Sequence, residues 1–360
     1  MQIETIEDYG ARLTPFNEIK RKDKTNYTYV KSGYNNIDNL IGGFILGQIS
    51  VWSGLNGSGK SAFLNQQIIE YINQGYKVML FSGELMDYSI KNIIYRLIAG
   101  KQYLTLSENK TYYYLKDDRI KQTIDNYIGN NLYIYNNHFG AKPKEIMETI
   151  RYAKDNLGVS IVILDNLMTM NLRELNVNKY EAQSEFAKEI ANLAKELEIH
   201  IHVVMHPTKT TGFLRKNDIS GSADLSNAVD NVFIIHRNNN DFKKSYMEFN
   251  NRVREDNELF NYDTFIEICK NREEGVQDRL LCFYFLPETK QIVETKGVEK
   301  PYINNVVVWY RNNVQRQKQW GLWWYRRKPT CLFANQPRSN VRVKSRRKTF
   351  YKIRLHFYFL

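Results

Sequence analysis

The sequence predicts an α/β fold in which helices cover both faces of a mostly parallel sheet. Between about residues 30 and 290, short apolar runs rich in β-branched residues alternate with longer runs of helical periodicity. Strand–helix alternation of this kind is typical of parallel sheets buried on both faces. The strand-like runs are 49–53, 77–82, 159–164, 199–205 and 231–235.

Two connecting segments show clear helical periodicity. Their apolar faces are formed by Ile146, Ile150, Ala153 and Leu157 in the first and by Phe186, Ile190, Leu193 and Leu197 in the second. Runs 264–269 and 280–285, joined by a short polar loop, predict a terminal β-hairpin. Polar stretches at 207–222 and 238–263 interrupt the pattern, and we expect such long stretches to be functional or disordered.

Charge is distributed unevenly along the chain. The 360 residues carry a net charge of +12, but residues 301–360 contain 14 Lys and Arg and no Asp or Glu. Residues 1–300 contain 37 basic and all 39 acidic residues, so affinity for nucleic acid must come from local patches. We expect an N-terminal linker or arm at 1–30, one catalytic domain at 31–295 and an irregular basic, aromatic tail at 296–360.

The tail differs in composition from the rest of the chain. Four of the five Trp lie in residues 309–324, and Arg outnumbers Lys. Three interpretations stay open: an arm that binds nucleic acid, a disordered or artificial extension, and a frame-shifted reading of the end of the gene. Translating the coding DNA in its other frames would test the third. No functional prediction depends on the tail.

Composition excludes several classes of protein. No apolar run approaches the roughly 20 residues that cross a bilayer, and the first ten residues lack the pattern of a signal peptide. The three cysteines, Cys269, Cys282 and Cys331, have no metal-ligand spacing. We therefore expect a cytoplasmic protein without a membrane partner.

A phosphate-binding loop is the most specific motif in the sequence. "GLNGSGKS", Gly54 to Ser61, matches G-x-x-x-x-G-K-[ST] between an apolar strand and a helix. Its glycines let backbone N–H groups point at phosphate oxygens, and the following helix adds its dipole. The predicted nucleotide-binding residues are Gly54, Gly57, Ser58, Gly59, Lys60, Ser61 and Ala62.

Acidic residues at two other strand ends complete the predicted chemistry. Lys60 is expected to reach the β- and γ-phosphates, while Ser61 and Asp165, after "VSIVIL", are expected to hold Mg²⁺. Glu84, the first acid after the strand "KVMLFS", is the candidate base that orients water. The alternatives are a turn-capping role for Asp165 and a surface position for Glu84.

Six segments in order resemble motifs of DnaB-type hexameric helicases and their phage and Twinkle-like relatives. They are "SGYNNIDNLIGGFILGQISVWSGLNGSGKS", "FSGELMDYSIKNIIYRLIAG", "VILDNLMTM", "VVMHPTK", "ISGSADLSNAVDNVFIIHR" and "IEICKNREEG". The resemblance covers about residues 30–292. It implies a RecA-like P-loop NTPase core.

The resemblance also implies roles for residues far from the loop. His206 would sense the γ-phosphate, and Lys270 and Arg272 would reach into the site of a neighbouring subunit. An Arg supplied in trans would stabilise charge on the transferring phosphoryl group. The alternatives are a packed histidine at a strand end and a solvated hairpin turn.

The polar segment 207–222 would face the central channel of a ring in this family. Lys209, Arg215 and Lys216 suit contact with phosphates of single-stranded DNA. The alternative is an ordinary mobile loop. The resembling families also carry a domain before the core, whereas about 30 residues precede it here. Residues 1–25 are a candidate linker helix that docks on the next subunit.

We therefore expect an ATP- and Mg²⁺-dependent replicative helicase that moves on single-stranded DNA in a bacterial or phage-infected cell. The expected assembly is a homo-oligomer, a hexamer by resemblance, with a primase or polymerase as a further partner. Two alternatives stay open. One is a RecA-like DNA-dependent ATPase that does not unwind DNA, such as a recombinase or loader. The other is a regulatory protein that uses nucleotide as a switch.

Overall fold

A computed structural model of the chain describes residues 13–19, 23–136, 142–166, 179–208, 211–219 and 228–310. These residues belong to one unit that spans Met1–Asn312. Its strands are β1 Tyr29–Val30, β2 Phe44–Ile45, β3 Ile49–Ser53, β4 Lys77–Ser82, β5 Leu104–Leu106, β6 Tyr113–Leu115, β7 Leu132–Ile134, β8 Val159–Asp165, β9 His200–Val204, β10 Asn231–Arg237, β11 Thr264–Asn271, β12 Arg279–Leu286 and β13 Gln291–Val293. Its helices are α2 Asn35–Ile41, α3 Lys60–Asn73, α4 Asp87–Ala99, α5 Asp118–Ile128, α6 Pro143–Tyr152, α7 Lys179–Leu197 and α9 Asn240–Phe249.

The main sheet has the strand order β13-β12-β11-β10-β3-β9-β8-β4-β7. The strands from β10 to β7 run parallel, while β11, β12 and β13 add an antiparallel edge. The predicted α/β fold with a mostly parallel sheet and a terminal hairpin is confirmed. All five predicted strands are present, with ends that differ from the prediction by at most two residues.

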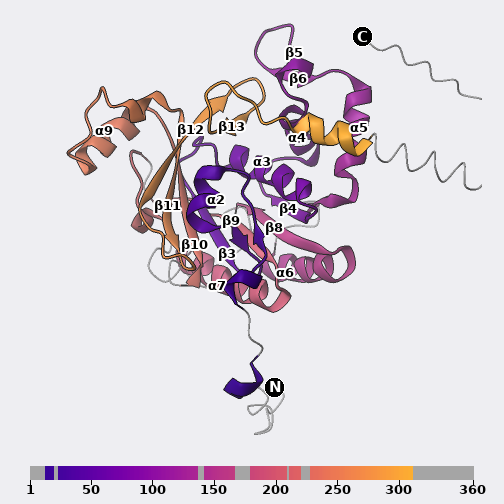
Figure 1. Cartoon of the computed structure of the whole chain (residues 1–360), viewed down its shortest axis with the longest axis vertical. Coiled ribbons are helices and arrows are strands. Elements are labelled where there is room, and N and C mark those ends of the chain that lie inside the picture. Colours follow the sequence, from indigo (N-terminus) through magenta and orange to yellow (C-terminus); the bar gives the residue numbers. More distant parts are fainter. Residues whose placement is uncertain are drawn as a thin grey trace, which may run out of the picture. The chain divides into compact units, whose positions relative to one another are not determined.

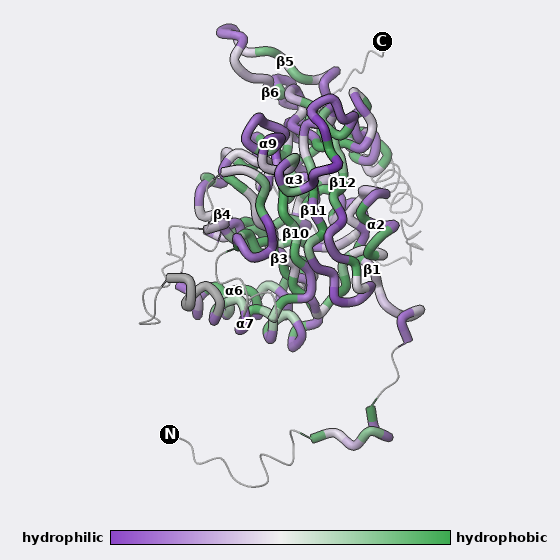
Figure 2. The backbone as a smooth tube through the Cα atoms, turned by 90° about the vertical axis from the view of Figure 1, so that its left-hand side faces the viewer, coloured by the Kyte–Doolittle hydropathy of each residue, from purple (hydrophilic) through white to green (hydrophobic). Residues whose placement is uncertain are grey.

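Two apolar cores lie on opposite faces of this sheet (Figure 1). On one face, α3 and α4 pack on side chains such as Trp52, Leu80 and Ile163. On the other face, α6 and α7 pack on their strand neighbours, including Val51 and Phe81. The central strands are accordingly largely hydrophobic along their length (Figure 2). Alternate side chains of one strand enter different cores because successive residues point to opposite faces.

The structure also contains elements that the sequence did not predict. The parallel edge strand β7 has only three residues, and β13 follows β12 through a tight turn. The polar stretch 238–263, expected to be without regular structure, contains helix α9. Its Phe242 packs with Phe213 and Phe265 in a third small apolar cluster. Neutral and charged neighbours hide this face in the sequence.

The two ends of the described chain behave differently. Residues 13–19 expose Leu13, Phe16 and Ile19 by 79%, 91% and 55%, respectively. Residues 302–310 are helical, and Tyr302, Ile303 and Val306 are buried against the core. This helix lies inside the range predicted as tail. Residues 311–360 lie outside the described residues, as do 1–12 of the predicted arm.

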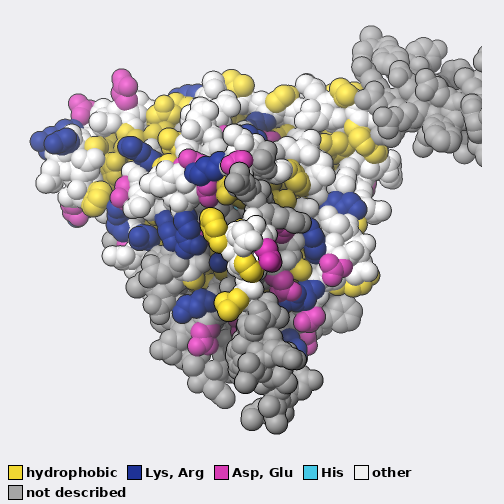
Figure 3. Space-filling model, turned by 60° about the horizontal axis from the view of Figure 1, so that its bottom comes forward, with side chains coloured by type: hydrophobic (Ala, Val, Ile, Leu, Met, Phe, Trp, Pro, Cys, Tyr) yellow, Lys and Arg dark blue, Asp and Glu magenta, His cyan; other side chains and the backbone are white. Residues whose placement is uncertain are grey.

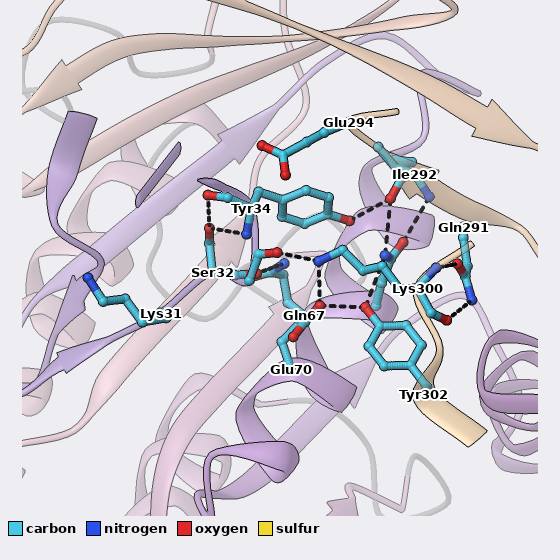
Figure 4. Close-up of polar contacts among 12 residues, drawn as sticks. Lys31, Ser32, Tyr34, Gln67, Glu70, Gln291, Ile292, Glu294, Lys300 and Tyr302 are labelled. Carbon is cyan, nitrogen blue, oxygen red and sulfur yellow. Dashed lines mark hydrogen bonds and ion pairs between the residues drawn. The ribbon is translucent and has the colours of Figure 1, made fainter. Parts of the chain in front are cut away.

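A polar cluster fixes the segment before this helix to the phosphate-loop helix α3 (Figure 4). We call Glu70, Lys300 and Tyr302 the C-terminal clasp. The Lys300 ammonium lies 2.5 Å from Glu70 Oε1 and 3.8 Å above the Tyr34 ring. The Tyr302 hydroxyl donates to the same carboxylate oxygen at 2.6 Å. Burial, and the Glu70 carboxylate beside it, raise the pKa of Tyr302 well above its usual value, so it stays a donor.

The same cluster places β13 beside α3. Gln66 of α3 donates to the carbonyl of Ile292 at 3.1 Å and accepts from its N–H at 2.8 Å. The Tyr34 hydroxyl donates to that carbonyl at 3.0 Å. A Cβ atom at Gly33 would lie 2.3 Å from the Glu70 carboxyl carbon, so only glycine fits there. The clasp therefore holds three distant segments together.

A buried histidine pair lies between β3 and β9. Both nitrogens of His200 are in use, with Nδ1 2.7 Å from the carbonyl oxygen of Ile45 and Nε2 2.9 Å from the Ser50 hydroxyl. Burial lowers the pKa of His200 to about 4.

The second ring, His202, accepts from the Trp52 indole N–H at 3.0 Å and lies 2.8 Å from the Tyr71 hydroxyl. Burial lowers its pKa well below the usual value, and His200 adds to the effect. Both imidazoles are therefore neutral in the folded protein at neutral pH.

The surface of the described residues is mixed in charge. Turned so that its lower side faces the viewer, the molecule shows separate groups of Lys and Arg interspersed with Asp and Glu (Figure 3). None of the helices in the described ranges is long and apolar enough to cross a lipid bilayer.

The clasp predicts a graded loss of stability. Replacing Glu70 with Gln leaves the largely buried Lys300 without a carboxylate, and we expect the free energy of unfolding to fall by about 3 kcal/mol. Tyr302→Phe removes one hydrogen bond and should cost about 1 kcal/mol. Urea denaturation of the full chain measures both. Equal, negligible losses would contradict the clasp.

The histidine pair predicts acid sensitivity. Both folded pKa values lie below the unfolded value of about 6.5, so stability is complete above that pH and is lost as the pH falls toward 4. His200 alone should remove about 2 kcal/mol of unfolding free energy near pH 5. Urea midpoints at neutral and acidic pH test this. The His200→Gln variant should be less stable at neutral pH but show a shallower pH dependence; an unchanged pH dependence would refute the assignment.

Candidate nucleotide site

The phosphate loop follows β3 at the edge of the sheet where the parallel strands end. Gly54 has φ +152°, and a Cβ atom there would lie 2.3 Å from the Ile235 carbonyl oxygen. The loop therefore needs glycine because it passes directly against β10. Gly59 has φ +103° and starts α3, whose first turn faces the loop.

Lys60 lies at the base of this loop and is 7% exposed. Its ammonium donates to the carbonyls of Gly54 at 2.7 Å and Leu55 at 3.0 Å. Burial lowers its pKa, while Asp165 and Glu84 oppose that shift. Among the described residues, no partner lies within hydrogen-bonding distance of the buried Ser58 hydroxyl. The loop thus offers a cation and an unused hydroxyl to an anionic ligand.

Asp165 ends β8, two strands away from the loop, and faces it. Burial raises the pKa of its carboxyl, whereas a hydrogen bond from Ser61 and the charge of Lys60 lower it. An alcohol oxygen and a carboxylate side by side are ligands suited to Mg²⁺, which also takes phosphate oxygens. Among the described residues, no three His, Cys, Asp or Glu side chains come close enough to hold a metal without such help.

Glu84 and His206 meet at the same edge through a residue that the sequence did not single out. The Asn166 amide nitrogen lies 2.6 Å from Glu84 Oε1 and 2.8 Å from His206 Nε2. Glu84 and His206 themselves are 3.9 Å apart. Asn166 is 2% exposed, and its peptide bond to Asp165 is cis. Its position after Asp165 was the only sequence signal.

These groups line one cavity of about 800 Å³. It runs from the phosphate loop, Asp165 and His206 to Arg237, Phe285 and Lys290 of the antiparallel edge. Burial lowers the pKa of Lys290, and the nearby Arg96 and Arg237 add to the effect. The cavity has room for a nucleoside triphosphate and carries several cations for its phosphates.

Arg96, in the second motif, supports this cavity from behind. Its guanidinium donates to the carbonyls of Pro287, at 2.5 Å, and Glu288. Pro287 lines the cavity, so Arg96 of α4 fixes the turn between β12 and β13 there.

Lys270 and Arg272 lie elsewhere. Lys270 pairs with Val232 near the start of β10, and its ammonium donates to the Val229 carbonyl at 2.8 Å. Arg272 forms an ion pair with Asp230 at 2.7 Å. Neither residue is among those that line the cavity. Both therefore lie at the opposite end of β10 from the chain's own phosphate loop.

The predicted DNA-contact residues are also separated. Lys209 lies outside the described residues. Arg215 is held within the chain, 2.6 Å from the buried Glu267 and 2.7 Å from Asp278. Lys216 lies close enough to Lys270 to contribute to its lowered pKa, after burial and Arg272. Lys216 therefore belongs to the same basic region as the two distant hairpin residues.

A model of the DnaB-like helicase C-terminal domain matches residues 29–292. The chain belongs to this family. The match begins before β1 and ends within β13, so it includes the entire cavity described above.

Curated relatives agree with the family. Replicative DNA helicase DnaB of Helicobacter pylori (strain J99) is 20% identical over 61% of this chain and 46% of its own length. The Arabidopsis thaliana Twinkle homolog is 24% identical over 58% of this chain and 30% of its own length. DNA repair protein RadA of Chlamydia muridarum is 22% identical over 68% and 45%. The chain spans about half the length or less of these relatives.

Solved structures show the same fold. The ATPase domain of a phage helicase superposes with a TM-score of 0.59 at 18% identity, covering 76% of this chain and 93% of that domain. A DnaB-like replicative helicase, studied with its interactions with primase, gives a TM-score of 0.58 at 18% identity, covering 74% and 62%. The RecA-like core expected from the sequence is confirmed.

Proposed function

We propose that this chain is the motor of a replicative DNA helicase, which hydrolyses ATP and moves as a ring of identical subunits on single-stranded DNA. The observation that carries the proposal is the division of the catalytic set. Lys60, Glu84, Asp165 and His206 surround one cavity, whereas Arg272 lies at the other end of β10. Family membership supports a hexamer and a cytoplasmic role in a bacterial or phage-infected cell, with a primase or polymerase as partner.

Each side chain has a defined task in this proposal. Lys60 and the loop N–H groups bind the β- and γ-phosphates, while Glu84 accepts the proton of the attacking water. Ser61 and Asp165 would hold Mg²⁺, which neutralises charge on the phosphates when bound. His206 contacts the γ-phosphate and reports its loss to the segment that follows β9.

DNA contact is proposed for segment 207–219, with Lys209 and Lys216 as its cations. Arg215 serves as the anchor of this segment because its charge is already matched by Glu267 and Asp278. Contacts to phosphates by such a segment would be independent of base sequence.

The alternatives keep specific support. Similarity to a DNA repair protein suits a RecA-like ATPase that binds DNA without unwinding it, such as a recombinase or loader. A protein that only switches with nucleotide would not need Glu84 or Arg272 for its output.

A forked-duplex unwinding assay with parallel ATPase measurements distinguishes these functions. We expect DNA-stimulated hydrolysis and strand separation, a hexamer with ATP and single-stranded DNA by mass photometry, and loss of both activities in Lys60→Ala. Stimulated hydrolysis without strand separation would favour the recombinase or loader. Hydrolysis that DNA does not accelerate would favour the switch. Full activity of Lys60→Ala would refute the site.

Mixing two inactive variants tests the contribution in trans. Arg272→Ala should lower the ATPase rate at least about 100-fold, because an arginine finger stabilises the charge of the transition state. In mixed rings, an Arg272→Ala subunit has an intact loop and a Lys60→Ala neighbour supplies an intact Arg272, so activity should return. Failure of the mixture to regain activity, although mixed assemblies form, would place Arg272 outside the neighbouring site.

A further inference from the structure

Asn166 occupies the point where the two predicted reaction-sensing groups meet. It follows β8, and it is 2% exposed at the γ-phosphate end of the cavity. Its single amide nitrogen lies within hydrogen-bonding distance of both Glu84, from the end of β4, and His206, from the end of β9. Three neighbouring strands therefore meet through one side chain.

The chemistry of the amide makes this contact directional. An amide nitrogen carries two hydrogens and only donates, so it can serve a carboxylate and an imidazole nitrogen at the same time. Glu84 Oε1 accepts one hydrogen at 2.6 Å, and His206 Nε2 accepts the other at 2.8 Å. A carboxylate in place of this amide would donate neither and would repel Glu84.

His206 also lies next to the proposed DNA-contact segment. Pro207 follows it directly and forms a β-bridge with Ile219, and the Thr208 N–H donates to the Asp218 carbonyl at 2.7 Å. The segment is thus closed at its base, immediately beside His206. A displacement of the segment would move the imidazole that Asn166 contacts.

We infer that Asn166 is a positioning residue that ties the orientation of the Glu84 carboxylate to the position of His206. The inference rests on the proposed function, because it deepens the role of the same site. Asn166 does not take part in the chemical step. It holds the base in place for water attack and passes a change at the DNA-contact segment to that base.

A merely structural role makes a different prediction. If Asn166 only stabilised the ends of the strands, its replacement would lower the melting temperature and leave hydrolysis by the folded protein unchanged. A positioning role affects the rate of hydrolysis with little effect on ATP binding.

The test uses two variants of the full chain. Asn166→Asp has nearly the same shape but loses both donated hydrogen bonds, and Asn166→Gln keeps the amide on a longer side chain. We expect Asn166→Asp to lower the DNA-stimulated kcat about tenfold or more, with the KM for ATP within about twofold of the parent. The ratio of rates with and without DNA should fall toward one, and Asn166→Gln should retain more of both.

A double-mutant cycle with His206→Ala makes the test sharper. If the two residues act as one unit on Glu84, the double variant Asn166→Asp/His206→Ala should lose no more than the more damaged single variant. Multiplying losses would overturn the inference. So would a kcat of Asn166→Asp within about twofold of the parent, or a raised KM with unchanged kcat.

Fluorescent ATP-analogue binding and thermal melting show whether each variant is folded. If Asn166→Asp does not fold, Asn166→Gln carries the test: a parent-like ratio of rates with and without DNA supports the inference, and a ratio near one with normal nucleotide binding overturns it. Failure of the proposed function is distinguishable, because then the parent chain itself would show no DNA-stimulated hydrolysis.

Discussion

The common direction of the strands from β10 to β7 determines where the polar groups of the site lie. Parallel strands end at the same edge of a sheet, so a residue just after one strand faces the residues just after its neighbours. The phosphate loop, Glu84, Asp165 and His206 follow β3, β4, β8 and β9, respectively. Their convergence needs no long-range signal beyond the strand order. It also leaves the opposite end of the sheet for groups such as Arg272.

This geometry explains which parts of the site could be predicted from the sequence. Glu84, Asp165 and His206 were found because each is the first chemically suitable residue after an apolar run, and strand ends are local features. Asn166 was missed because its importance lies in partners 82 and 40 residues away in the chain. The charge of Arg215 looked available for DNA, but its partners Glu267 and Asp278 are brought near only by the folded hairpin.

The fold shows the same division between local and long-range information. Strands β3, β4, β8, β9 and β10 are buried on both faces and read as continuous apolar runs. Helix α9 was not predicted because its aromatic face packs on a small side cluster within a polar stretch. Charge composition marked residue 296 as the start of a tail, yet it carried no sign that Lys300 would pair with Glu70. Such pairings depend on tertiary contacts rather than on local propensity.

The anchor at Arg215 limits how the proposed DNA-contact segment can move. Glu267 is 2% exposed and lies within 3.3 Å of His236 as well as 2.6 Å from Arg215. Withdrawing the guanidinium would leave a buried carboxylate without its main counter-charge, which is costly in a protein interior. The segment around Arg215 therefore moves together with β11, the strand on which Glu267 lies. Because Lys270 and Arg272 follow Glu267 closely in the chain, a shift of this segment is transmitted to the residues that face a neighbouring subunit in the proposed ring.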